Sequence, residues 1–183
     1  MHYLTCVFIG ETNSIEAAVD RALAPFDESR LVPPWKNHLH AGEIADMAAN
    51  FGVPPDDLGT LAARMPEWAA CAGGIDRRGL YALRITNPRG RWDWYTIGGR
   101  WRRLLPGNRI RASELLHSPR LEELLPHDFV TPDGRWHSRE RPVRKPDGNL
   151  GFRRRRPALW LDEFRAALAT HPEHLVVFVD RHQ

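Results

Sequence analysis

The most continuous apolar runs in the chain lie near its two ends. Residues 3–9 are almost entirely apolar or β-branched, and Gly10 closes the run. Residues 175–179 form a second run of the same kind. Short apolar runs bounded by turn residues are typical of buried strands. We therefore expect these two strands to pair side by side in the centre of one sheet.

Other segments repeat their apolar residues at helical spacing. Four segments fit helices: residues 15–23, 42–50, 55–65 and 160–168. Asn13 or Ser14 supplies a side chain that can cap the first of them. The two middle helices follow a loop that contains consecutive prolines. We therefore predict a helical insertion at about residues 33–70.

Alternating apolar and polar residues predict two β-hairpins. In the first, residues 80–86 and 92–97 flank an Asn-Pro-Arg-Gly turn. The second lies within residues 127–138, where Pro-Asp-Gly forms the turn. Residues 139–157 are basic and carry no periodicity, so a solvated loop is expected there.

The order of these elements predicts an α+β fold. Strand, helix, hairpin, hairpin, helix and strand follow one another along the chain. We expect a single domain over residues 1–183 with an antiparallel or mixed sheet. The N- and C-terminal strands should be central, and the helices should cover one face. A ferredoxin-like arrangement is the nearest template.

Composition narrows the class of protein. There are two cysteines, Cys6 and Cys71, and both lack the neighbours of a zinc site, so we expect neither a structural zinc site nor a disulfide framework. No apolar run has the length of a membrane span, so we expect a cytoplasmic protein without membrane contact.

The formal net charge is +3, and arginine supplies nearly all the positive charge. A GC-rich genome would explain that excess, and recognition of phosphate or carboxylate is the functional alternative.

Residues 87–103 are the most unusual stretch, with three of the seven tryptophans, five arginines and one acid. On a strand, Trp92 and Trp94 would share one face, and Asp93 and Tyr95 would share the other. The first face either fills the core or offers a stacking platform. The second places a carboxylate beside a phenol.

The glycine pair that follows suggests an anion site. Gly98 and Gly99 allow positive φ, so their neighbouring amides can form an anion-binding nest. Arg100 follows at once and offers a bidentate donor. The opposing interpretation is a plain turn beside core tryptophans, with Asp93 in an ion pair.

Four motifs in order make the chain resemble a family of small uncharacterised proteins of bacteria and their phages. They are the Leu-Ala-Pro-Phe-Asp-Glu segment, the block at residues 92–101, the Thr-Pro-Asp-Gly-Arg-Trp-His turn and the Val-Asp-Arg-His end at residues 179–182. After the turn, the family usually continues with Gly-Met-Gly-Trp, where this chain has an arginine-rich insert. The resemblance implies one fold unit and a phage-related origin, and it supplies no reaction.

The motif residues suggest an enzymatic alternative. Asp180 and His182 are two apart on the last strand and therefore share a face. If they meet His137 and Asp93, the group suits a divalent metal or acid–base catalysis near neutral pH. A solvated C-terminus is the alternative interpretation of the first two.

A basic run suggests a third function. Arg153, Arg154, Arg155 and Arg156 are consecutive, and further basic residues precede them. Contact with the phosphate backbone of nucleic acid would explain the run, and a solvated loop is the alternative. No standard nucleic-acid-binding motif is present.

The leading hypothesis is a pocket for a small anionic molecule of the nucleotide class. Trp94 or Trp101 would stack on a ring, while Arg100 and the Gly98 and Gly99 amides would hold the anion. In the enzymatic alternative, Asp93, Tyr95 and His137 are the catalytic candidates, and Asp180 and His182 are the metal ligands. Ligand identity, reaction and oligomeric state stay open.

Overall fold

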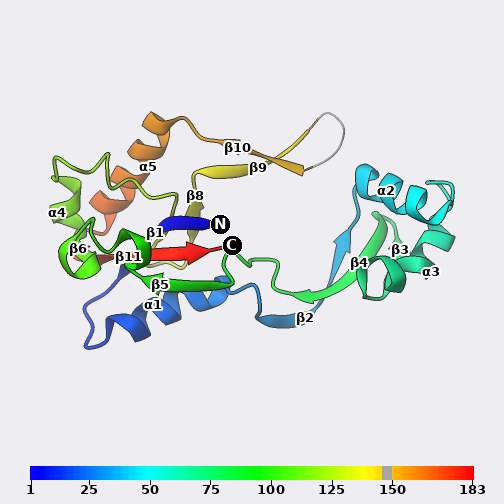
Figure 1. Cartoon of the computed structure of the whole chain (residues 1–183), viewed down its shortest axis with the longest axis horizontal. Coiled ribbons are helices and arrows are strands. Elements are labelled where there is room, and N and C mark those ends of the chain that lie inside the picture. The colour runs from blue at the N-terminus through cyan, green and yellow to red at the C-terminus, as the bar shows by residue number, and fades with distance from the viewer. Residues whose placement is uncertain (146–149) are drawn as a thin grey trace. The chain divides into compact units, whose positions relative to one another are not determined.

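A computed structural model describes residues 1–145 and 150–183 (Figure 1). The fold is α+β, as the sequence predicts. The chain forms two compact units. The first contains Met1–Arg30, Asn87–Arg141 and Arg153–Gln183, and the second contains Leu31–Thr86 and Pro142–Phe152.

A mixed sheet organises the first unit, in the order β5-β11-β1-β7-β8, and β6 also pairs with β11. Its strands are β1 (His2–Ile9), β5 (Trp94–Ile97), β6 (Arg109–Arg111), β7 (Asp128–Val130), β8 (Trp136–Ser138) and β11 (Leu175–His182). The two terminal strands pair antiparallel along their whole length, from His2 opposite His182 to Ile9 opposite Leu175. They lie in the middle of the sheet, which confirms the prediction. The parallel pairing of β7 with β1 makes the sheet mixed.

Helices cover both faces of this sheet, so the prediction of helices on one face is wrong. The helices of the unit are α1 (Ile15–Leu23), α4 (Ala112–Leu116) and α5 (Pro157–Thr170). Cys6 and Phe8 of β1 share a core cluster with α4 and α5, whereas Val7 and Ile9 share one with α1. A continuous apolar strand buries both of its faces and needs cover on each. A ferredoxin-like sheet has its helices on one face only, so that template does not describe this unit.

The second unit has a three-stranded antiparallel sheet in the order β2-β4-β3. Its elements are β2 (Leu31–His38), α2 (Ala41–Phe51), α3 (Leu58–Ala69), β3 (Gly73–Asp76) and β4 (Gly79–Thr86). Met47, Leu61, Met65 and Leu80 are fully buried between the helices and the strands. Both helices expected within residues 33–70 are present, but the predicted loop before them contains β2. A register shift between Leu31 and Trp35 accommodates its two prolines.

The first predicted hairpin does not form. Among the described residues, β4 pairs with β2 and β3 of its own unit, whereas β5 pairs with β11. The side-chain amide of Asn87 donates to the carbonyls of Pro25 and Asp27, at 2.9 and 2.8 Å. These bonds hold the chain after β4 against the end of the 3₁₀ helix η1 (Ala24–Phe26). The Asn-Pro-Arg-Gly turn therefore leads into the first unit and does not reverse β4 onto β5.

Part of the predicted basic loop at residues 139–157 is a two-stranded ribbon. It consists of β9 (Glu140–Arg144) and β10 (Leu150–Arg154). The loop's last residue, Pro157, begins α5. Residues 146–149 of that loop lie outside the described part of the chain.

Candidate functional site

A basic depression of about 590 Å³ opens at one end of the mixed sheet. It is lined by His2, Trp94, Thr96, Gly99, Arg100, Arg102, Arg103 and Asp180. We call it the arginine pocket. Trp94, Gly99, Arg100 and Asp180 were all predicted site residues, and the pocket brings them together. Trp94 is 43 % exposed, so this indole is not sealed in the core.

Strand register assembles the pocket from distant parts of the chain. His182 of β11 lies opposite Trp94 on one side and opposite His2 on the other. Asp180 lies opposite Thr96 of β5 in the same way. Residues opposite one another in adjacent strands share a face of the sheet, and so do residues two apart. The edge strand β5 therefore adds its Trp94 and Thr96 to the face that carries Asp180.

The Asp180 carboxylate is the structural centre of the pocket. It is 3 % exposed. One oxygen accepts a hydrogen bond from His2 Nδ1, and the other accepts one from the Arg100 amide, both at 2.9 Å. The predicted anion nest is therefore not open to a ligand, because the Arg100 amide binds this carboxylate and the Gly98 amide donates to the Phe178 carbonyl at 2.8 Å. An external anion would have to use other donors.

Gly99 permits this close approach. It has φ of +44°, and a Cβ built on it would lie 2.4 Å from the Cβ of Asp180. Such a separation is far below van der Waals contact, so no larger residue fits without movement. Gly99, the first residue of the 3₁₀ helix η2 (Gly99–Trp101), is therefore required for packing around Asp180, whereas a Cβ at Gly98 would collide with the Asn108 side chain at 2.4 Å.

A cluster of rings and carboxylates borders the same end of the sheet. Trp94 stacks on His182 with ring centroids 5.3 Å apart and planes 10° from parallel. The Nδ1 atom of His182 hydrogen-bonds to Asp93 at 2.8 Å. Partial burial raises the pKa of Asp93, but the hydrogen bonds from His182 and the Trp94 amide outweigh it and leave that pKa below its ordinary value. Two Asp–His pairs thus lie together, His2–Asp180 and His182–Asp93.

Three guanidinium groups of the pocket are available to a ligand. Arg100, Arg102 and Arg103 are exposed, and their side chains make no hydrogen bond or ion pair with the described residues. Other arginines, such as Arg111 and Arg120, pair with nearby glutamates. These three guanidinium groups are therefore not paired with a carboxylate among the described residues. Sequence reasoning did not single out Arg102 and Arg103 as lining residues, although both follow the predicted site directly.

Trp101 does not line the pocket, contrary to one form of the leading hypothesis. It is partly buried against the core cluster on the α4 and α5 face. Its buried indole Nε1 has no hydrogen-bond partner among the described residues. Trp94 is therefore the only one of the two stacking candidates that lines the depression.

A bend at Asp93 changes which side chains share a face. Trp92 and Tyr95 pack edge to face with ring centroids 5.1 Å apart, although strict alternation would separate them. Trp92 precedes β5 and makes an isolated bridge with Asp27. The regular strand begins only at Trp94. The prediction that Trp92 and Trp94 point the same way is therefore wrong.

Tyr95 belongs to a neighbouring acidic depression of about 550 Å³ that also includes Glu16 and Asp93. Its hydroxyl donates a hydrogen bond to Asp20. Burial raises the pKa of Tyr95, and the hydrogen bond to the Asp20 carboxylate raises it further. A phenol with a raised pKa stays protonated near neutral pH and does not act as a base.

His137 is far from the other catalytic candidates in the sheet. It lies on β8, whereas Asp93 borders β5, at the opposite edge. Its ring stacks on Phe129 at 4.4 Å and its Nδ1 bonds to Glu163 at 3.0 Å. Burial lowers the pKa of His137, the charges of Arg155 and Arg135 lower it too, and Asp133 opposes them. The predicted meeting of His137 with Asp93 and His182 therefore does not occur.

The two predicted metal ligands have other partners. Asp180 binds His2 and the Arg100 amide, and His182 binds Asp93. Among residues 1–145 and 150–183, no group of three histidine, cysteine, aspartate or glutamate side chains has an arrangement that would hold a metal ion.

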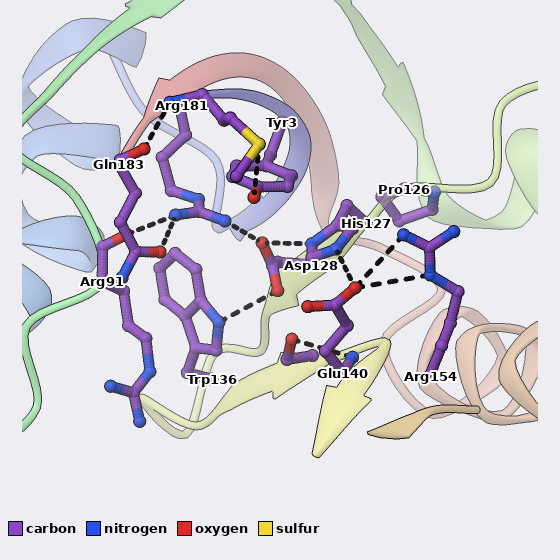
Figure 2. A network of polar contacts seen from close by, with 12 residues as sticks. Tyr3, Arg91, Pro126, His127, Asp128, Trp136, Glu140, Arg154, Arg181 and Gln183 are labelled. Carbon is purple, nitrogen blue, oxygen red and sulfur yellow. Dashed lines mark hydrogen bonds and ion pairs between the residues drawn. The ribbon is translucent and has the colours of Figure 1, made fainter. Parts of the chain in front are cut away.

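A buried ion pair lies on the other face of the same strand. Arg181 stands between Asp180 and His182, so its side chain points away from the arginine pocket. Its guanidinium binds Asp128 at 2.5 Å, and these residues are 3 % and 1 % exposed (Figure 2). The guanidinium also lies over the rings of Tyr3 and Trp136 and donates to the Arg91 carbonyl. Burial raises the pKa of Asp128, but the His127 hydrogen bond and the Arg181 charge outweigh it and hold that pKa below its ordinary value.

Comparison with known proteins adds no assignment. No family model, no curated protein and no solved structure matches the chain. The resemblance to bacterial and phage proteins therefore stays a prediction. None of the helices in the described ranges is both long and apolar enough to cross a bilayer.

Proposed function

We propose that this protein binds a small anionic ligand of the nucleotide class in the arginine pocket. The observation that carries the proposal is the group of three unpaired guanidinium groups beside a half-exposed indole. The volume of about 590 Å³ lies within the range of small-molecule sites.

The pocket's chemistry favours a phosphorylated ligand with a ring. Guanidinium groups bind phosphate oxygens in bidentate geometry. Trp94 offers a flat apolar surface to a base, and the Thr96 hydroxyl adds a hydrogen-bonding group. Asp180 does not oppose the anion strongly, because its two hydrogen bonds direct the carboxylate toward His2 and the Arg100 amide.

The test is ligand-induced thermal stabilisation across a panel of nucleoside mono-, di- and triphosphates. Arg100→Ala should weaken binding of the stabilising nucleotide by about 10–100-fold, because a hydrogen bond to a charged group contributes about 1.5–3 kcal/mol. Trp94→Ala should weaken binding of the nucleotide more than binding of inorganic triphosphate, since only the nucleotide has a ring to stack.

Arg77→Ala is the matched control, because Arg77 is also an exposed arginine without a partner among the described residues but lines neither this pocket nor another basic cavity. It should leave the shift in melting temperature unchanged. A shift that survives Arg100→Ala, or one that both variants reduce equally, would contradict the proposal.

The two Asp–His pairs favour a second candidate function, acid–base catalysis on a phosphate ester in the same pocket. Asp180 fixes the His2 ring through Nδ1, and His2 Nε2 makes no bond to the described residues. His2 Nε2 would take a proton from water as the water oxygen bonds to phosphorus. The ester oxygen would leave with that proton, and the arginines would stabilise the charge that develops.

His2→Gln and Asp180→Asn should each lower hydrolysis of bis(p-nitrophenyl) phosphate by about 100-fold or more, the usual contribution of a positioned base. His117→Gln is the control, because His117 is an exposed histidine that does not line the pocket. Unchanged rates of hydrolysis in both pocket variants would exclude this candidate function. Loss of hydrolysis on addition of a chelator would favour the metal-dependent hypothesis instead.

A further inference from the structure

A second basic cavity lies in the first unit, at the beginning of α5. Its volume is about 440 Å³. It is lined by Arg141, Arg153, Arg154, Arg155, Arg156, Leu159 and Glu163. We call it the α5 cleft. It shares no lining residue with the arginine pocket, and the proposed nucleotide binding makes no use of it.

Three of the five guanidinium groups in the cleft are free to bind a ligand. Arg154 pairs with Glu140 at 3.2 Å, and Arg155 pairs with Glu163. The other three arginines, Arg141, Arg153 and Arg156, are exposed and make no hydrogen bond or ion pair with the described residues. The cleft thus carries more positive charge than its glutamates neutralise.

The crowding of these charges is unfavourable without an anion. Arg155 is mostly shielded from water, with 16 % of its side chain exposed. Burial lowers the pKa of Arg155, and the charge of Arg141 lowers it further. Like charges that lie close together repel one another more strongly where they are partly shielded from water. A bound anion would relieve that repulsion and would gain bidentate contacts to the guanidinium groups.

The first turn of α5 adds backbone N–H donors to the α5 cleft. Arg156 occupies the N-cap, where no side chain accepts from the helix amides, and the first turn contains no acidic residue. The free N–H groups and the helix dipole at such an end favour phosphate. Leu159 of this turn lines the cleft, so the helix end and the arginines face the same space.

We propose that the α5 cleft binds the phosphodiester backbone of a nucleic acid. The three free guanidinium groups come from β9, from β10 and from the N-cap of α5, so a backbone with several phosphates can engage all of them together. No aromatic side chain lines the cleft, and therefore no base stacks there. Binding should follow the backbone charge with little preference among sequences.

The experiment measures fluorescence anisotropy of a labelled oligothymidylate of about 20 nucleotides over a series of salt concentrations. Arg153→Ala/Arg156→Ala should weaken binding by about tenfold or more in low salt. It should also reduce the slope of log K against log salt by about 1.4, since each phosphate contact in a single strand contributes about 0.7. Both side chains are exposed and unpaired, so the fold should persist, which a melting curve checks.

The matched control is Arg77→Ala/Arg78→Ala, which removes the same charge from two exposed arginines of the second unit. It should leave the affinity and the slope unchanged. Arg102→Ala/Arg103→Ala, in the arginine pocket, should retain oligonucleotide binding. Failure of nucleotide binding in the pocket would therefore leave the result for the cleft intact, and the reverse also holds.

Three results would overturn the proposal. The first is wild-type affinity in Arg153→Ala/Arg156→Ala. The second is an equal loss in the Arg77 and Arg78 control, because net charge alone would then explain binding. The third is competition by inorganic triphosphate that matches the oligonucleotide at equal phosphate concentration, because a short polyphosphate would then be the ligand.

Discussion

Replacing Arg181 with methionine is expected to lower the free energy of unfolding by about 3–5 kcal/mol, the usual cost of breaking a buried ion pair by removing one partner. The substitution keeps an apolar stem between Tyr3 and Trp136 but leaves the Asp128 carboxylate buried without its guanidinium. Chemical denaturation followed by circular dichroism measures the difference.

Arg111→Met is the matched control. Arg111 pairs with Glu173 at 3.2 Å, but the two side chains are 40 % and 83 % exposed. An exposed pair contributes at most about 1 kcal/mol, so this variant should be close to wild type. The double variant Arg181→Met/Asp128→Ala should lose less than the sum of the two single losses, because the two residues interact directly. Additive losses would show that the pair is not coupled.

The same ion pair predicts a dependence on pH. The folded pKa of Asp128 lies below its ordinary value of 3.8. A carboxyl with a lowered pKa contributes stability above its unfolded pKa and loses it as the pH falls through the folded value. The free energy of unfolding should therefore decline as the pH drops below about 4, and less steeply in Asp128→Asn.

Gly99→Ala should be the most damaging substitution for the arginine pocket. A residue other than glycine at positive φ costs on the order of 1–3 kcal/mol, and here the new methyl group would also collide with Asp180. Asp180 would have to move away from His2 and the Arg100 amide. Thermal unfolding should show a destabilised protein, and stabilisation by the nucleotide should disappear.

The Gly107→Ala variant measures the effect of backbone strain at positive φ without a steric collision. Gly107 also has positive φ, +66°, but a Cβ at that position would meet no atom within 4 Å. This variant should lose about 1 kcal/mol and keep ligand binding. Equal effects of the two substitutions on binding would contradict the role assigned to Gly99.

The pairing of strands shows where prediction from sequence succeeds and where it does not. The apolar runs at the two ends identified β1 and β11, and their burial placed them in the centre of the sheet. Alternation likewise identified β4 and β5, but a period of two does not specify the partner of a strand. The hydrogen bonds of Asn87 to Pro25 and Asp27, 60 or more residues away in sequence, direct the chain elsewhere.

The candidate site was predicted in part for a similar reason. Trp94, Gly99 and Arg100 are close in sequence, so a local motif located them together. The bend at Asp93 was not predictable from alternation, and it moved Tyr95 and Trp92 to one side. His137 carries a catalytic side chain type, yet its strand lies at the far edge of the sheet.

The sequence by itself therefore determined the local elements, the buried strands and the concentration of arginine, tryptophan and glycine around residue 99. Those properties follow from spacing and side-chain chemistry along a short stretch. Only the tertiary structure decided that His2 meets Asp180, 178 residues away, and that this carboxylate accepts the hydrogen bond of the Arg100 amide that follows the glycine pair. Such contacts depend on which strands pair and in which register. Both are determined only when segments that are distant in sequence pack into one core.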